Sequence, residues 1–516
     1  MCFRARTFAL VLALLGLGSL SAHAQSAATY DTTTVNGRKA VVIGTSTAGI
    51  AHPVQGGDVT WTNDYLWVLD DLVFVDEGQT LRIEPGTVVK GDPGTGADAS
   101  ALVVARGGTI FAEGTARRPI IFTSLKDDLT TTEDRSRYFR GGWGGVIVLG
   151  RAPINPEAGV HDVEGIPPNS FRNVYGGNDP HDNSGVLRYV SIRHGGTVLE
   201  EDEEINGLTL AGVGRGTTVE YVEVVGNKDD GIEFFGGTVD ATHLVTAFVG
   251  DDNYDIDQGY SGRGQFWLGV QNRYYADHAG EHDGGEAEYG GEDSRPFSTP
   301  QLYNVTYVGS GRNGTGSTAL NLRDNFAGAY YNSLFVDFPG ALVRVENHLD
   351  PEVGDSWARF QEGTLQLRGN LLGRIGGRAD GGGPARRLVA NTKYGPVGKA
   401  AAEQLGLSDA ALPRRVSQSL ARQNARTTDA PVRTLQRSPR GFLQHLNPRP
   451  TSEALRVEEA MPPTDGFFAP VDYVGAFSAT DNWARSWSYL GQGGSEYPGL
   501  GLFESQARPD AQRRVE

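Results

Sequence analysis

The chain has 516 residues, a formal net charge of −17 and a single cysteine. This charge argues against binding of nucleic acid or anionic lipid through bulk electrostatics. The cysteine, Cys2, lies in the N-terminal leader, which excludes both a disulfide framework and a thiol catalyst in the mature protein.

The first 24 residues have the features of a secretory signal peptide. Arg4 and Arg6 supply positive charge, residues 8–20 form an apolar core, and Ala22-His23-Ala24 is a cleavage site of the A-x-A type. The sequence therefore predicts export to the periplasm, the cell surface or the extracellular space. No later run is apolar enough to cross a bilayer, so we expect no transmembrane segment.

Residues 25–60 are rich in Thr and Gly and are expected to form an irregular lead-in. From Trp61 to about residue 375, short β-branched runs alternate with glycine-containing turns, and no stretch has the period of a helix. Within this span, residues 151–185 and 274–293 are expected to be long loops. The pattern predicts an all-β solenoid over residues 61–375.

A repeat within residues 204–271 specifies the kind of solenoid. A step of 24 residues carries Leu208-Thr209-Leu210 onto Ile232-Glu233-Phe234 and then onto Ile256-Asp257-Gln258. A fixed step with short strands and Gly/Asn/Asp corners is typical of a parallel β-helix, and parallel crossovers favour the right-handed form. Residues 24 apart are then expected to lie directly over one another, about 4.8 Å apart.

This register predicts a cluster of carboxylates on the outer face. Glu233 and Asp257 would face outward in one stack beside the acidic corners, and clusters of oxygen ligands suit Ca²⁺. The expected ligands are Asp229, Asp230, Glu233, Asp252, Asp255 and Asp257. Two other interpretations stay open: a solvated acidic face, and corner acids that accept hydrogen bonds from their own backbone.

Two residues beside the acids are candidates for contact with a bound ligand. Lys228 lies next to Asp229 and would face an anionic group, and Trp267 would stack on a sugar ring. Packing in the core is the alternative for Trp267. His278-Ala279-Gly280-Glu281-His282 matches the H-x-x-E-H zinc-protease pattern, but Gly280 and the glycines that follow it argue against the helix which that chemistry needs. An acidic loop that binds a cation, or a solvated loop, is expected instead.

Composition changes after residue 375. Residues 376–463 are rich in Arg, Ala, Gly and Gln and are expected to be a partly disordered linker, with a short helix at Lys399–Leu405. Aromatic residues return over 464–503, which are expected to fold back and cap or flank the stack, because a solenoid must cover its apolar ends. Residues 504–516 are expected to be a tail.

The chain resembles a family of secreted bacterial right-handed parallel β-helix proteins in the pectin-lyase-like superfamily, some of which carry the label "multidrug transporter". The resemblance covers nearly all of the mature chain and implies the β-helix fold and export, but no particular activity. The motifs that carry it are Gly78–Thr87, Gly108–Ile110, Pro119–Ser124, Trp143–Ile147, Asp229–Thr238, Asp251–Asp255, Gly475–Phe477 and Asn482-Trp483.

Two functions from different classes follow. The first is an exported, non-enzymatic binding or scaffold protein that presents the acidic face, with Ca²⁺, to glycans or cell-surface components. The second is an enzyme that acts on acidic polysaccharide. In a hydrolase, paired acids would act on the glycosidic bond. In a lyase, Lys228, Arg188 or Arg193 would serve as the base beside Ca²⁺. An outward-facing basic residue in the acidic stack would favour the enzyme. The 24-residue register places Thr209 below the acids and Glu281 above them, so we favour binding, and no catalytic residue is identified.

Overall fold

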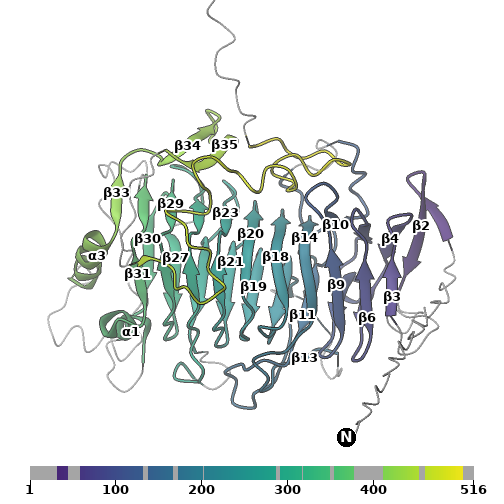
Figure 1. Ribbon diagram of the computed structural model, residues 1–516, viewed down its shortest axis with the longest axis horizontal. Helices are drawn as coiled ribbons and strands as arrows, with labels where there is room; N and C mark the ends of the chain where they lie inside the picture. The colour runs from purple at the N-terminus through teal and green to yellow at the C-terminus, as the bar shows by residue number, and fades with distance from the viewer. Residues whose placement is uncertain are drawn as a thin grey trace, which may run out of the picture.

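The computed structural model describes residues 32–44, 58–131, 137–164, 166, 172–200, 203–285, 291–315, 318–348, 354–376, 411–451 and 460–503. The predicted signal peptide, the expected helix at 399–405 and the tail lie outside these residues. Within them, the chain winds into a parallel β-helix whose coils stack along the long axis of the molecule (Figure 1). None of the helices in these residues has both the length and the apolar character needed to span a bilayer.

Each coil visits three faces in the same order, and every strand pairs in parallel with its equivalent in the next coil. Three long strands, β14 (Gly185–Arg193), β18 (Thr218–Val225) and β20 (Ala241–Ala247), bend at mid-length and contribute to both of the first two faces.

Besides the first halves of those three strands, face 1 contains β3 (Asp58–Trp61), β6 (Thr80–Ile83), β9 (Thr109–Glu113), β22 (Arg263–Gln265), β25 (Gln301–Tyr303), β28 (Ala329–Tyr331) and β31 (Gln366–Arg368). Besides their second halves, face 2 contains β2 (Arg38–Ile43), β4 (Leu66–Leu69), β7 (Val88–Gly91), β10 (Ile120–Ser124), β23 (Leu268–Val270), β26 (Thr306–Val308), β29 (Leu334–Val336), β32 (Leu371–Gly373) and β33 (Ala425–Thr427).

Face 3 is a separate nine-stranded sheet of β5 (Leu72–Val75), β8 (Ala101–Val104), β11 (Val146–Leu149), β17 (Leu208–Ala211), β19 (Ile232–Phe235), β21 (Tyr254–Asp257), β24 (Gly280–Asp283), β27 (Thr318–Arg323) and β30 (Ala341–Val345). The other elements are β1 (Thr32–Val35), η1 (Gly96–Asp98), β12 (His161–Asp162), β13 (Val174–Tyr175), β15 (Val198–Glu200), β16 (Glu203–Glu204), α1 (Ser356–Glu362), α3 (Ala411–Gln423), β34 (Val432–Arg437) and β35 (Leu443–Pro450).

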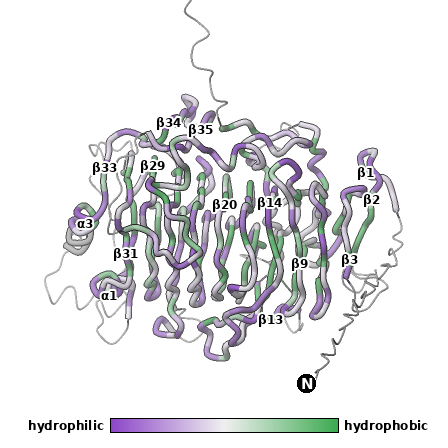
Figure 2. Tube along the Cα trace, in the orientation of Figure 1, coloured by the Kyte–Doolittle hydropathy of each residue, from purple (hydrophilic) through white to green (hydrophobic). Residues whose placement is uncertain are grey.

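The core fills the inside of the coils because successive residues of a strand point to opposite sides. In β6, Leu81 and Ile83 are buried while Arg82 between them is exposed. Hydrophobic and hydrophilic residues accordingly alternate along many strands (Figure 2). Large aromatic side chains occupy the middle of the core, where Phe234 stacks on Trp267 with ring centroids 5.5 Å apart.

The corner between faces 1 and 2 carries a column of aromatic rings on the outside. Tyr189, Tyr221, His243 and Phe266 all have φ between +50° and +60°, a region that bulky side chains rarely adopt. Their rings stack from coil to coil, with centroids 4.4, 4.3 and 4.9 Å apart. The stacking offsets part of the backbone strain, and the column provides an apolar surface for another segment to cover.

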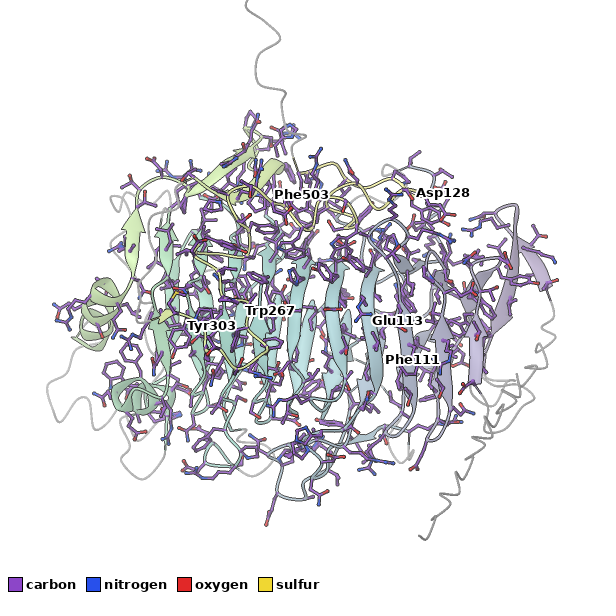
Figure 3. All side chains as sticks on the ribbon, viewed as in Figure 1. Phe111, Glu113, Asp128, Trp267, Tyr303 and Phe503 are labelled. Atoms are coloured by element: carbon purple, nitrogen blue, oxygen red, sulfur yellow. The ribbon has the colours of Figure 1, made fainter. Side chains whose placement is uncertain are left out.

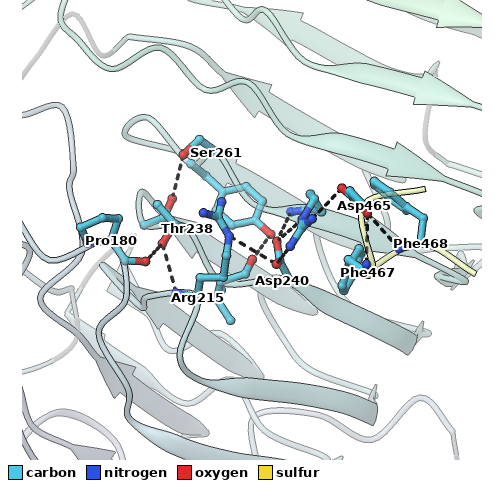
Figure 4. A network of polar contacts seen from close by, with 12 residues as sticks. Pro180, Arg215, Thr238, Asp240, Ser261, Asp465, Phe467 and Phe468 are labelled. Atoms are coloured by element: carbon cyan, nitrogen blue, oxygen red, sulfur yellow. Dashed lines mark hydrogen bonds and ion pairs between the residues drawn. The ribbon is translucent and has the colours of Figure 1, made fainter. Parts of the chain in front are cut away.

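That segment is the aromatic C-terminal stretch, which flanks the coils as the sequence predicted. Trp483 and Trp487 pack edge-on against Tyr221, and in Figure 1 this stretch (yellow) crosses the strands of several coils. Tyr489 donates its backbone N–H to the buried carboxylate of Glu223, at 2.5 Å. Arg263 makes a second attachment, because it bonds both Asp240 of the preceding coil and Asp465 of the C-terminal stretch. Asp240 and Asp465 are labelled in Figure 4.

The ends of the stack differ from the sequence prediction. The expected lead-in already contains β1 and β2, and β2 pairs with β4, because Val41 and Ile43 supply inward-facing apolar side chains. The expected linker contains α3 and β33, which extend the stack beyond residue 375. Leu420 of α3 is fully buried in the main core, so this helix covers the end of the stack opposite β2 (Figure 1). The sequence does not reveal this role, because large apolar residues are sparse in this part of the chain.

The step between coils is not constant. Leu208 pairs with Ile232, as the 24-residue spacing predicts, but Ile232 pairs with Tyr254, only 22 residues further on. The predicted alignment of Glu233 with Asp257 is therefore wrong, and Glu233 lies opposite Asp255. A shift of two residues preserves the alternation of inward and outward side chains, so sequence pattern alone does not detect it.

Candidate functional site

Three columns of side chains run across the coils at the corner that leads into face 3. Equivalent positions follow from the pairing of Leu208 with Ile232, Ile232 with Tyr254 and Tyr254 with Gly280. The outer corner column contains Asp229, Asp251 and Asp277; the inner corner column contains Asn206, Asp230, Asp252 and His278; the strand column contains Thr209, Glu233, Asp255, Glu281, Asn321 and Arg344. Stacking at about 4.8 Å per coil thus gathers carboxylates from distant parts of the chain.

Hydrogen bonds to the backbone hold the inner corner column in place. Asp230 Oδ1 accepts from the backbone N–H of Asp252 at 2.8 Å, and Asp252 Oδ1 accepts from the backbone N–H of His278. The interpretation that corner acids bond the backbone is thus correct for both. Gly231 permits the close approach of the coils, since a Cβ there would lie 2.5 Å from the carbonyl oxygen of Asn253. These bonds occupy one oxygen of each carboxylate.

Two groups of carboxylates share Asp230. Asp229, Asp230 and Asp251 form one group and Asp230, Glu233 and Asp255 the other, and in each group the potential ligand oxygens lie within 4.8 Å of one another. Asp230 and Glu233 are only 7% and 6% exposed. Buried Asn206 donates its amide N–H to Glu233, and its amide oxygen has no hydrogen-bond partner in the described part of the chain. The donor set of carboxylate and amide oxygens is the kind that binds Ca²⁺.

The carboxylates raise one another's pKa values in this arrangement. Burial is the main cause, and it raises the pKa of Asp229 to about 7 with the help of the neighbouring Asp251, Glu204 and Glu164. Burial and the other acids likewise raise the pKa values of Asp230, Glu233 and Asp255 well above their ordinary range. A charged cluster of this kind is costly unless protons or cations neutralise it.

The structure distributes the six predicted metal ligands unequally. Asp229, Asp230, Glu233 and Asp255 belong to the two groups, whereas Asp252 lies with His278 and Glu281. Asp257 belongs to neither group. It lies opposite Phe235, two residues after Asp255, and is therefore the next residue on the same side of the strand. The sequence reasoning missed Asp251 as a ligand. The 22-residue step would have identified it, since it places Asp251 over Asp229.

Of the two predicted ligand-contact residues, Trp267 is not available for that role, and the role of Lys228 stays a prediction. Trp267 is fully buried between Phe234 and Tyr254, and its indole N–H donates to the carbonyl oxygen of Ala241 at 3.0 Å. Figure 3 marks its place among the central coils. The prediction that Trp267 stacks on a sugar is therefore wrong. Trp267 lies at the corner just before β23, and its side chain points into the core. Lys228 is partly exposed, but its ammonium is paired with Glu204.

The H-x-x-E-H residues do not all converge, because His282 lies apart from His278 and Glu281. Gly280–Asp283 is strand β24, not a helix or a loop, so neighbouring side chains point to opposite sides. His282 is fully buried and its Nε2 lies 2.6 Å from the hydroxyl of Tyr330, and burial lowers its pKa to about 3. Glu281 lies in the outward-facing strand column with His278 two residues before the strand, and both come close to Asp252.

Basic residues do lie in or beside the strand column. They lie further along the stack than Thr209 and Glu281, the two positions that the sequence register identified. Arg344 follows Asn321 in that column, and Arg323 bonds Asp283 at 2.6 Å and lies 3.6 Å from Glu281. Burial opposes the charge of Arg323, but its bond to Asp283 and the surrounding carboxylates outweigh burial and raise its pKa. A guanidinium held in this way is a poor proton acceptor.

A further group was not anticipated. Glu292, Asp324, Glu346 and His348 lie near the far end of face 3, with His348 Nε2 2.7 Å from Glu292. Burial and Glu346 raise the pKa of Asp324 to about 6. These residues come from widely separated turns, and only the stacking of β27 and β30 brings Asp324 and Glu346 together.

Comparison with known families agrees with this architecture. Residues 53–372 match the model of a pectate-lyase-like β-helix domain. No curated protein and no solved structure matches the chain.

Proposed function

The chain belongs to the family of pectate-lyase-like β-helix domains, and on that premise we propose that it is an exported, non-enzymatic binding or scaffold protein whose acidic face holds Ca²⁺ for an acidic glycan. The observation that carries the proposal is the pair of carboxylate groups that share Asp230. Asp229, Asp251, Glu233 and Asp255 would complete the ligand set.

The chemistry of these residues fits Ca²⁺ better than other common cations. All donors are oxygens, they come from a loose row of stacked coils, and Ca²⁺ accepts irregular geometry where Mg²⁺ demands a tight octahedron. A bound Ca²⁺ would offset the repulsion that raises the carboxylate pKa values, and its remaining positions would accept carboxylates of a uronate-containing glycan.

Binding is favoured over catalysis because the three basic residues that the sequence offered as a base are already committed. Arg188 is paired with Glu220 and Glu113 on face 1, and Lys228 with Glu204. Arg193 is 1% exposed and its Nε donates to Ser191 Oγ at 2.7 Å. Two arginines favour a lyase. Arg344 follows Asn321 in the strand column, two strands beyond Glu281, and Arg323 lies beside the acids, where its bond to Asp283 opposes a role as base.

Thermal denaturation tests the cation. Chelator-treated protein should melt at a lower temperature than protein in millimolar Ca²⁺ at low ionic strength, because a ligand at 100 times its Kd stabilises the native state by about 2.7 kcal/mol. Glu233→Gln should shrink the difference. Asp64→Asn, which changes an exposed acid away from the site, should preserve it. Coincident melts of the unaltered protein with and without Ca²⁺ would contradict the proposal.

A panel of acidic polysaccharides tests the ligand and the absence of chemistry. Binding of a polyuronate should require Ca²⁺ and should be weakened in Glu233→Gln. Prolonged incubation should release neither unsaturated nor reducing ends. Release of such ends, lost in Arg323→Lys, would replace this proposal with the lyase.

A further inference from the structure

We propose that Asp252, His278 and Glu281 form a second metal site, distinct from the Ca²⁺ cluster and suited to a divalent transition metal of the Zn²⁺ type. The three residues come from two adjacent coils: Asp252 and His278 are neighbours in the inner corner column, and Glu281 is in the strand column. One potential ligand atom of each lies within 4.8 Å of the other two. This inference does not depend on Ca²⁺ or on glycan binding.

The distances suit direct coordination. His278 Nδ1 lies 3.4 Å from Asp252 Oδ1 and 3.9 Å from Glu281 Oε1. In a tetrahedral Zn²⁺ site with bonds of about 2.0–2.1 Å, ligand atoms are about 3.3 Å apart. Small side-chain adjustments would therefore complete three protein ligands and leave one position open, and the two carboxylates would balance the charge of the ion.

The imidazole of His278 supplies independent support. Its side chain is 3% exposed, and neither ring nitrogen has a hydrogen-bond partner within the described ranges. Burial of a polar group without such a partner is unfavourable. Nδ1 faces the two carboxylates, so coordination of a metal there would satisfy an atom that the protein itself leaves unsatisfied.

The other ring nitrogen is placed to orient the ligand. His278 Nε2 lies 3.6 Å from Asp277 Oδ1, at the outer corner of the same coil. Histidine ligands commonly donate their second ring N–H to a carboxylate, which fixes the tautomer and the ring orientation. On the opposite side, Asn321 donates to Glu281 and Arg323 lies 3.6 Å from it, which restrains that carboxylate.

An imidazole among the ligands also separates this site from the oxygen-only cluster. Imidazole nitrogen suits Zn²⁺ and its first-row neighbours, whereas Ca²⁺ and Mg²⁺ select oxygen. Saturating Ca²⁺ should therefore leave the Asp252–His278–Glu281 site free for Zn²⁺.

Calorimetric titration of untagged, chelator-treated protein with Zn²⁺, in millimolar Ca²⁺, tests the site. We expect one tight Zn²⁺ per chain. His278→Gln should weaken it by more than the roughly 10–100-fold that loss of an outer-shell partner costs. Glu233→Gln, which alters the Ca²⁺ cluster, and His445→Gln, which removes an exposed histidine elsewhere, should leave the affinity within about twofold, since neither residue is a ligand or an outer-shell partner.

X-ray absorption at the zinc edge, on unaltered protein with one equivalent of Zn²⁺, keeps the test decisive if His278→Gln does not fold. We expect one imidazole and otherwise oxygen ligands, with Glu281→Gln weakening binding. Absence of tight Zn²⁺ binding, a spectrum without imidazole, or equal affinity in folded His278→Gln would each overturn the site.

Discussion

Asp229 shows how stacking changes the chemistry of a single residue. Its carboxyl is an ordinary corner acid in the sequence, yet burial and the neighbouring Asp251, Glu204 and Glu164 raise its pKa to about 7. At the same corner, the buried imidazole of His278 has a lowered pKa, because burial outweighs the nearby acids. Residue type alone does not indicate either shift, since both arise mainly from burial in the folded stack.

The raised pKa of Asp229 makes the Ca²⁺-free protein less stable as pH rises. The folded state binds the proton more tightly than the unfolded state, whose carboxyl titrates near 4, so stability is lost between about pH 4 and pH 7. Asp229→Asn should reduce this loss by at least about 1 kcal/mol, since one pKa unit corresponds to about 1.4 kcal/mol.

Chemical denaturation at pH 5 and pH 7.5, in chelator, measures the effect. Asp64→Asn serves as the control, because this acid is exposed and away from the corner columns. Equal pH dependence in Asp229→Asn and in the unaltered protein would show that Asp229 does not titrate in this range.

Among the elements, the C-terminal stretch is attached to the coils through a network of partly exposed ion pairs centred on Arg263. Asp240 is 10% exposed at its side chain and contacts both Arg263 and Arg215, and Arg263 in turn bonds Asp465 and lies over the ring of Phe467 (Figure 4). By contrast, Arg82 and Asp58 form a pair on face 1 whose side chains are nearly half exposed.

These two pairs should differ in their contribution to stability. Asp240→Asn should lower the free energy of unfolding by about 1.5–3 kcal/mol, the range for hydrogen bonds to charged groups. Asp58→Asn should cost no more than about 1 kcal/mol, because surface ion pairs contribute little. Denaturant titration of both variants measures the difference, and equal effects would mean that Asp240 does not anchor the C-terminal stretch.

For the whole molecule, the outer aromatic column and the C-terminal stretch depend on each other. Phe477 and Trp487 are fully buried against the coils, together with Tyr489 at 4% exposed. Without that cover, the column of Tyr221, His243 and Phe266 would form an exposed apolar patch, which promotes association.

Truncation after Thr451 should therefore destabilise the protein and make it self-associate. Removing one buried aromatic side chain costs about 3–5 kcal/mol, and this truncation removes several. Thermal melts, dye binding and light scattering are the measurements. The control is the chain without residues 504–516 alone, which should behave as the full chain does. A monomeric truncated protein with an unchanged melting temperature would contradict the role of the stretch.

The sequence by itself determined the fold of the central stack and the face that carries its acids. Alternation of apolar and polar residues sets which side of a strand faces inward, and Gly, Asn and Asp mark the corners, so Glu233 and Asp257 could be placed outside. The match of Leu208 to Ile232 was predicted from the repeat and is confirmed. The C-terminal aromatics were expected to cap or flank the stack because a solenoid must cover its apolar ends, and Phe477 and Trp487 pack against the coils.

Only the tertiary structure decided which acids meet. The number of residues per coil changes from 24 to 22 and then to 26 in successive steps, and changes by an even number leave the alternation intact while they move the vertical neighbours. Asp257 thereby leaves the cluster and His278 comes to lie beside Asp252. The sequence likewise did not determine the direction in which the Trp267 side chain points. An aromatic ring near a corner can pack in the core or outside it. Only stacking on the rings of Phe234 and Tyr254 places Trp267 in the core.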